Sequence, residues 1–150
     1  MAAVQLDPQA VQYIAVHCSA TQPTQDIGVK EIDRMHRQRG FLKIGYHFVI
    51  RRNGVIEKGR EVTEIGAHVE GFNSKSIGVC LVGGINKSGK AEDNFTLDQY
   101  AALAQLIQDL RKAFPKATVQ GHRDFPNVKK DCPCFDVKTW LKETVDVVTD

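Results

Sequence analysis

Three side chains of the kinds that bind metal ions stand at the ends of predicted secondary-structure elements. His17 closes a β-rich stretch, His122 closes a second one, and Cys132 lies in the loop that follows. Two imidazoles and one thiolate suit zinc, which takes nitrogen and sulfur ligands tetrahedrally. Three protein ligands leave a fourth position for water, which distinguishes a catalytic zinc site from a closed structural one. The spacing alone matches no standard zinc motif, so the alternative is that each histidine is simply a hydrogen-bonded strand residue.

The elements that must position these side chains are strands interspersed with helices. Asn53-Gly54 predicts a tight hairpin, and Thr96 with Gln99 three residues later predicts the start of a long amphipathic helix. Apolar runs and helical periodicity predict strands over 13–18, 46–52, 55–58, 76–82 and 118–122, and helices over 29–38, 96–114 and 135–145. This order predicts an α/β (α+β) fold, with a central mixed sheet of about five to six strands flanked by about three helices.

Composition limits the classes of protein to which the chain can belong. The 150 residues carry 20 Lys and Arg against 18 Asp and Glu, a net charge of +2. This length predicts one domain over residues 1–150, with a core large enough to need no disulfide. No basic stripe suggests binding to nucleic acid, and no run of about 18 apolar residues suggests a membrane span. The first residues lack the pattern of a secretory signal, so we expect a cytoplasmic protein and free thiols at its four cysteines.

Several short motifs follow one another between residues 16 and 136. They are VHCSAT (16–21), GYHF (45–48), GAH (66–68), GFN (71–73), SIGVCLVGG (76–84), NFT (94–96), GH (121–122) and KDCPCFD (130–136). Taken together, they make the chain similar to zinc N-acetylmuramoyl-L-alanine amidases of the type 2 class, which share a fold with peptidoglycan recognition proteins. The most similar set of motifs is that of the small amidase lysozymes of T-seven-type bacteriophages.

The resemblance implies a role for each matching residue. His17, His122 and Cys132 would bind one Zn²⁺ per chain, and Tyr46 and Lys130 would match the catalytic tyrosine and lysine of the family. Zinc lowers the pKa of bound water toward about 7, and the negative charge that develops on the substrate requires a second stabiliser. The lysine would supply that stabiliser, and the tyrosine would hold or deprotonate the attacking water. Without the resemblance, the same two residues would be interpreted as a solvated loop lysine and a core aromatic.

Three further residues are expected in the substrate groove. The resemblance places His68, Phe72 and Asn73 in the segment that lines this groove, and a substrate contact is favoured over metal ligation for His68. Cys134 stands where the related phage amidases carry a small residue that does not bind metal, so it is a rival to Cys132 as ligand.

Two other histidines are expected outside the groove. His36 is predicted on the polar side of the first helix. His47 should face the side of its strand opposite Tyr46, in a structural or supporting position.

The resemblance implies zinc-dependent hydrolysis of the amide bond between N-acetylmuramic acid and L-alanine in peptidoglycan. A monomeric phage endolysin made in the host cytoplasm, which reaches the wall after the inner membrane is permeabilised, is the favoured interpretation. The alternatives are a cytoplasmic amidase that recycles wall fragments and a peptidoglycan-binding module without activity. The related phage enzymes also inhibit their phage RNA polymerase, and residues 2–6 resemble theirs in part.

Overall fold

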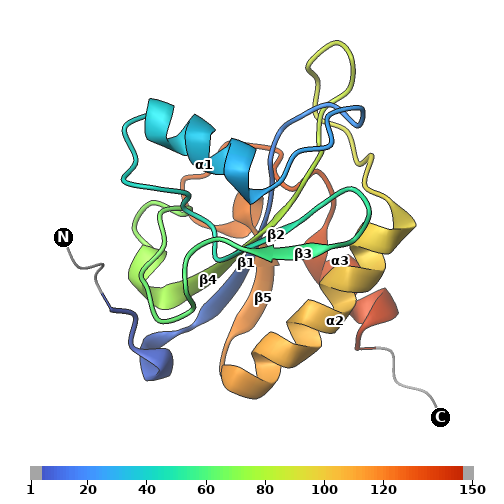
Figure 1. The fold of residues 1–150 in the computed structure, drawn as a ribbon. Coiled ribbons are helices and arrows are strands. Elements are labelled where there is room, and N and C mark those ends of the chain that lie inside the picture. Colours follow the sequence, from blue (N-terminus) through green and yellow to red (C-terminus); the bar gives the residue numbers. More distant parts are fainter. Residues whose placement is uncertain (1–4, 147–150) are drawn as a thin grey trace.

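The chain folds around one five-stranded mixed sheet, as the computed structural model of residues 5–146 shows (Figure 1). Along the chain the strands and helices are β1 (Tyr13–Cys18), α1 (Val29–Gln38), β2 (Phe48–Ile50), β3 (Ile56–Lys58), β4 (Ser76–Leu81), α2 (Leu97–Ala113), β5 (Thr118–Gly121) and α3 (Val137–Thr144). Within residues 5–146, none of the helices has the length and apolar character needed to span a bilayer.

The strand order across the sheet is β3-β2-β4-β1-β5. β1 lies between β4 and β5 and is parallel to both, β2 is parallel to β4, and β3 pairs antiparallel with β2. The carboxyl ends of the four parallel strands therefore meet at one edge of the sheet, where α/β proteins usually place their functional residues.

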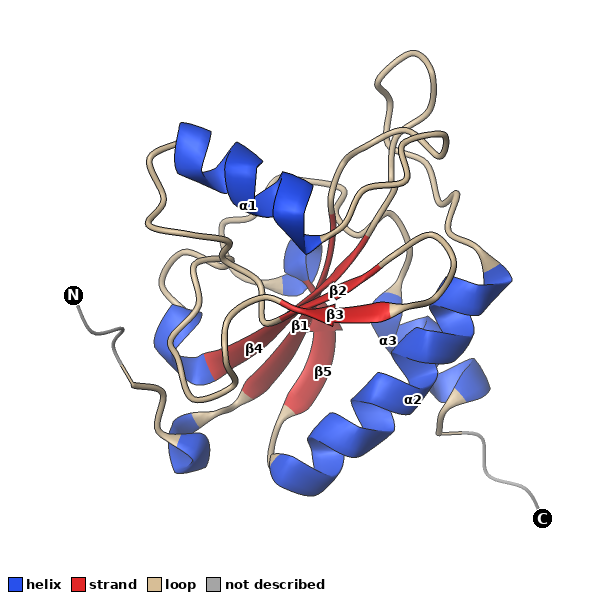
Figure 2. Ribbon diagram, in the orientation of Figure 1, coloured by secondary structure: helices blue, strands red, loops and turns tan. Residues whose placement is uncertain are grey.

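Helices cover both faces of the sheet (Figure 2). On one face, Leu103 and Ile107 of α2 and Leu141 of α3 pack against inward-facing strand residues such as Val16 and Val79. On the other face, Ile32 of α1 packs against Val49 and Cys80. Because side chains alternate along a strand, His17 points to the face that carries α1, away from the larger core around Val16.

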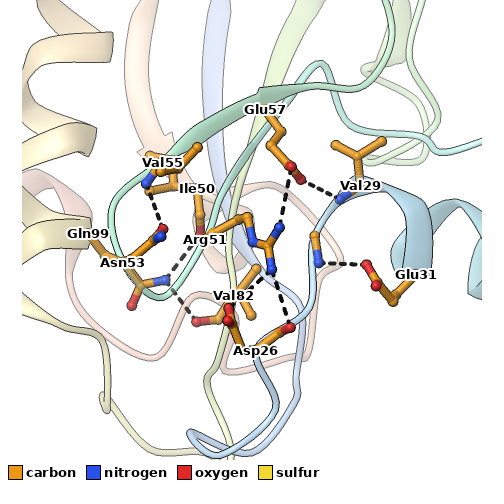
Figure 3. A network of polar contacts seen from close by, with 11 residues as sticks. Asp26, Val29, Glu31, Ile50, Arg51, Asn53, Val55, Glu57, Val82 and Gln99 are labelled. Atoms are coloured by element: carbon orange, nitrogen blue, oxygen red, sulfur yellow. Dashed lines mark hydrogen bonds and ion pairs between the residues drawn. The ribbon is translucent and has the colours of Figure 1, made fainter.

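A network of polar contacts fixes the start of α1 against the β2–β3 hairpin (Figure 3). The guanidinium of Arg51 lies 3.4 Å from Asp26 and 3.5 Å from Glu57. The backbone N–H of Val29 donates to Glu57, and that of Gly28 donates to Glu31, both at 2.8 Å. Carboxylates at a helix N-terminus accept hydrogen bonds from its free N–H groups, and their negative charge interacts favourably with the helix dipole. These contacts anchor the helix whose last turn reaches the functional site.

The sequence predicted this architecture closely. The capping box at Thr96 and Gln99 is confirmed, with hydrogen bonds of 3.0 and 2.9 Å, and the predicted α1 and β1 keep their bounds. The hairpin around Asn53-Gly54 is also confirmed, but its strands are shorter than predicted, with three residues each. The last helix begins at Val137 because the side chain of Asp136 caps it.

Candidate active site

The structure brings the three predicted metal ligands together. One ligand atom each from His17, His122 and Cys132 lies within 4.8 Å of the other two, and within residues 5–146 no other triad of potential ligands does so. These residues are up to 115 positions apart in the chain, so only the tertiary fold makes them neighbours. Two nitrogen donors and one sulfur donor are a set that zinc accepts readily.

Strand topology explains why the two histidines meet. His17 is near the carboxyl end of β1, and His122 directly follows β5, the parallel neighbour of β1. Their ring centroids lie 4.5 Å apart. The side chain of Asp124 accepts a hydrogen bond of 2.9 Å from the N–H of Gly121, which holds the short 3-10 turn that carries His122.

Contacts of the following loop place Cys132 beside the histidines. Its carbonyl accepts from the N–H of Arg123 at 2.9 Å, and its Sγ accepts from the N–H of Cys18 at 3.0 Å. A Cβ on Gly121 would lie 2.8 Å from Cδ of Pro133, so glycine at that position lets the loop pack closely against β5. A backbone N–H directed at Sγ stabilises a thiolate, the form of cysteine that binds metals.

Burial keeps the imidazoles of the site neutral. It lowers the pKa of His17 well below the ordinary value, and His68 and His122 lower it further. Burial also lowers the pKa of His122 to about 4, with a contribution from Lys130. Neutral imidazole is the form that binds metal, so both rings are ready to act as ligands near neutral pH.

A pocket of about 850 Å³ opens beside His122, one of the three predicted ligands. Its lining includes six of the eight site residues predicted from the sequence: Tyr46, His68, Phe72, Asn73, His122 and Lys130. His17 itself is only 1% exposed, so the pocket reaches the metal ligands through His122 and the residues around it.

Tyr46 and Lys130 approach the ligands from different parts of the chain. The Tyr46 ring centroid lies 5.0 Å from that of His17, and burial raises the pKa of its phenol well above the ordinary value. The hydroxyl therefore stays protonated near neutral pH. Lys130 is exposed at the rim of the pocket, in the loop that leads to Cys132, and its charge lowers the pKa of both histidine ligands.

The three residues predicted in the substrate groove line the pocket but also make contacts within the protein. Oδ1 of Asn73 accepts from the N–H groups of His68 and Val69, both at 2.8 Å. Phe72 packs edge-on against Phe125, with ring centroids 5.1 Å apart. The ring of His68 is hydrogen-bonded to His17, with Nε2 of His17 2.8 Å from Nδ1 of His68. Their direct contact with substrate stays a prediction.

The two other histidines are both buried. His36 was predicted on the polar side of its helix, which is wrong: it is 5% exposed, its Nδ1 accepts from the N–H of Gly45 at 2.9 Å, and it borders the pocket. A usable signal was present, because His36 follows Ile32 by four residues and therefore shares its inward face. His47 has the structural position expected, since its Nδ1 accepts from the N–H of Gly78 and its Nε2 donates to a carbonyl.

Cys134, the rival ligand, is directed elsewhere. Its Sγ lies 3.2 Å from the carbonyl oxygen of Gly84, and it is not part of the converging triad. Burial raises the pKa of its thiol to about 12, so the thiolate is scarce near neutral pH. All four cysteines are free thiols.

Comparison with known proteins identifies the class of enzyme to which this fold and site belong. The chain belongs to the N-acetylmuramoyl-L-alanine amidase family, because the sequence model of that family matches residues 7–135. It is 47% identical over 141 residues to the endolysin of Enterobacteria phage K11, which covers 94% of this chain and 91% of that protein. It is 42% identical over 142 residues to the endolysin of Escherichia phage T7, with 95% and 93% covered.

A solved structure agrees with this assignment. The fold matches the N-acetylmuramoyl-L-alanine amidase LysC from Clostridium intestinale URNW with a TM-score of 0.76 and 26% identity, over 94% of this chain and 90% of that chain. The resemblance and the fold class predicted from the sequence are therefore confirmed. The chain is an enzyme of the amidase class, so the alternative of a binding module without activity is not supported.

Proposed function

We propose that this amidase uses zinc, held by His17, His122 and Cys132, to cleave the bond between N-acetylmuramic acid and L-alanine in peptidoglycan. The observation that carries the proposal is the convergence of these three side chains beside a pocket that Tyr46 and Lys130 also line. Amide hydrolysis near neutral pH requires an activated nucleophile and a stabiliser for the charge that develops on the carbonyl oxygen. The pocket offers groups for both tasks.

The residues present suit a zinc ion. The two imidazoles are neutral at neutral pH, so neither has to lose a proton before it binds a metal, and Sγ of Cys132 accepts a backbone N–H at 3.0 Å. When bound, zinc acts as a Lewis acid that makes water a better nucleophile and polarises a carbonyl group. Three protein ligands are the number found in catalytic sites rather than closed structural ones.

Two residues of the pocket would act directly on the reacting groups. Lys130 carries a positive charge at the rim and would stabilise the negative charge that develops on the substrate oxygen. The protonated hydroxyl of Tyr46 would orient the attacking water by hydrogen bonding, because its raised pKa makes it a poor base in the resting state. Within residues 5–146, no carboxylate joins the ligand triad to act as base.

The proposed biological role is that of a phage endolysin, a monomer made in the host cytoplasm that degrades the host wall during lysis. Identities of 42–47% to the endolysins of phages T7 and K11, over nearly the whole length of each protein, support this role over recycling of wall fragments. Such an enzyme would also be bacteriolytic when it is applied to cells whose outer membrane has been permeabilised. Light scattering of the purified protein tests the monomeric state.

The experiment that tests the proposed activity is digestion of purified peptidoglycan, followed by mass spectrometry of the products. The proposal predicts stem peptides with a free N-terminal alanine and intact glycan strands. EDTA should abolish their release, and added Zn²⁺ should restore it. Products cleaved within the glycan, or activity that survives removal of the metal, would contradict the proposal.

Inhibition of a phage RNA polymerase stays a separate prediction. It was based in part on residues 2–6, of which residues 2–4 lie outside the described part of the chain. Leu6 is buried, and its N–H donates to the carbonyl of Thr63 at 2.6 Å. A pull-down with the polymerase of the cognate phage tests the prediction, and failure of the full chain to capture the polymerase would reject it.

A further inference from the structure

A chain of hydrogen bonds leads from the buried side of His17 into the sheet. Nε2 of His17 lies 2.8 Å from Nδ1 of His68, and Nε2 of His68 lies 3.3 Å from Oγ of Ser76. Oγ of Ser76 in turn donates to the carbonyl of Phe72 at 2.8 Å. The residues come from β1, the 66–73 loop and β4, and the register that pairs Tyr13 with Ser76 and His17 with Cys80 places Ser76 and His17 on one face of the sheet.

The chemistry of these groups determines where each proton lies. A carbonyl can only accept, so the single hydroxyl proton of Ser76 is used toward Phe72. Toward His68, the Ser76 oxygen must therefore accept, which places a proton on Nε2 of His68. A neutral imidazole has one donor and one acceptor nitrogen, so Nδ1 of His68 accepts from Nε2 of His17. The lone pair of His17 is then on Nδ1.

The neutral imidazole that this arrangement requires is also the form that binds a metal, and His17 is only 1% exposed, an environment that disfavours an unpaired charge. Among residues 5–146, the hydrogen-bonding contacts of the His17 ring are made by Nε2 alone, which leaves Nδ1 for another partner.

The fold holds the His68 ring tightly in this position. A Cβ on Gly78 would lie 2.7–2.8 Å from three atoms of the ring, and a Cβ on Gly66 would lie 2.7 Å from its Cδ2. Asn73 fixes the backbone on the same loop by accepting the N–H of His68. The His68 ring therefore packs directly against Gly66 and Gly78, where any larger residue would collide with it. This close packing restricts the orientation of the ring.

We propose that His68 and Ser76 are positioning residues that fix the tautomer and orientation of His17, so that Nδ1 of His17 is presented to the metal ion. The inference rests on the proposed zinc site. Partners of this kind raise the basicity of a histidine ligand and remove the cost of choosing the correct tautomer when metal binds. His68 thereby acts on the metal site through His17 and does not itself bind the ion.

The first test measures the tautomers directly. Long-range ¹H–¹⁵N correlation of the imidazole nitrogens, recorded on the zinc-free protein, should show His17 and His68 both protonated at Nε2. In the Ser76→Ala variant, His68 should lose this preference. After addition of Zn²⁺, the signal of Nδ1 of His17 should shift as that of the metal-bound nitrogen. A proton on Nδ1 of His17, or coordination through Nε2, would overturn the proposal.

The second test measures zinc affinity by competition with a chromophoric chelator. His68→Ala should bind zinc about 10- to 100-fold more weakly than the wild type, the range measured for partners of metal-binding histidines. His68→Gln should recover part of the loss, because its amide oxygen can accept the proton of His17. Ser76→Ala should also weaken binding, whereas Ser74→Ala, at an exposed position in the 3-10 turn directly before β4, should not.

The outcomes separate this inference from the proposed function. If the wild type itself fails to bind Zn²⁺, the proposed zinc amidase is wrong, while the tautomers in the zinc-free protein still test the hydrogen-bonded chain. If the wild type binds Zn²⁺ and a folded His68→Ala variant binds it equally well, the positioning role is refuted. Should His68→Ala fail to fold, as judged by circular dichroism, Ser76→Ala and the wild-type tautomers decide the question.

Discussion

Replacement of Gly78 by alanine should damage the metal site from a position that touches no metal ligand. The added Cβ would lie 2.7 Å from Cγ and 2.8 Å from Cδ2 and Nδ1 of the His68 ring. Carbon atoms in contact are normally about 3.5–4.0 Å apart, so the ring must move or tilt by roughly 0.7–1.3 Å. A movement of that size misaligns the 2.8 Å hydrogen bond from His17 to His68.

The magnitude follows from two opposing effects. Overpacking a close-packed interior costs about 1–3 kcal/mol, and alanine regains about 0.5–1 kcal/mol relative to glycine within a strand. The net loss of up to about 2.5 kcal/mol in the free energy of unfolding corresponds to a fall of up to roughly 10 °C in Tm for a chain of this length. Zinc affinity should fall by about tenfold or more, as for other losses of a supporting partner.

A matched control separates the damage to the site from general destabilisation. Gly89 has a φ of +78° with no atom within 4 Å of a Cβ, so Gly89→Ala strains the backbone by roughly 1 kcal/mol without touching the site. Thermal unfolding and chelator competition on both variants provide the comparison. If Gly78→Ala keeps the zinc affinity of the wild type, or if Gly89→Ala loses as much, the reasoning is refuted.

The remaining predictions concern residues of the site and one buried histidine. Cys132→Ala should lose both bound zinc and amidase activity, and a metal-free variant with full activity would exclude the mechanism. Lys130→Ala and Tyr46→Phe should retain zinc in metal analysis yet lose about 10²- to 10³-fold in kcat, and loss of the metal instead would indicate a structural role. Cys134→Ser should change neither property, since Cys134 lies outside the ligand triad. In the zinc-free protein, burial lowers the pKa of His36, so below about pH 6.5 the unfolded chain binds a proton there that the folded protein does not. The free energy of unfolding should therefore fall as the pH drops below about 6.5. In urea titrations, His36→Gln should reduce the slope of this free energy against pH by up to about 1.4 kcal/mol per pH unit.

Local sequence signals were sufficient to predict most of the fold. The capping pair Thr96 and Gln99, the Asn53-Gly54 turn and the apolar run over β1 each specify their element within a few residues of sequence. The ends of the hairpin were less predictable. The regular ladder ends at Ile50 because the turn begins at Arg51, whose N–H donates to the carbonyl of Val55 at 2.9 Å and whose carbonyl accepts from the N–H of Gly54 at 2.8 Å.

The residues of the candidate site could be predicted only where they belong to a recognisable sequence motif. Residue types and spacing suggested His17, His122 and Cys132 weakly, and the order of several motifs made the assignment specific. Ser76 could not be found in this way, because a serine in a buried strand carries no motif and its partner His68 meets it only in the folded chain. His17 and His68 are likewise 51 positions apart in the chain, so no local pattern predicts their contact.

X-ray absorption at the zinc edge, recorded on protein whose amidase activity has been measured, tests the central claim most directly. The account predicts one zinc per chain with two nitrogen neighbours at about 2.0–2.1 Å, one sulfur at about 2.3 Å and one further light atom from solvent. A shell with two sulfur atoms, a shell of four protein ligands, or active protein that contains no metal would contradict it.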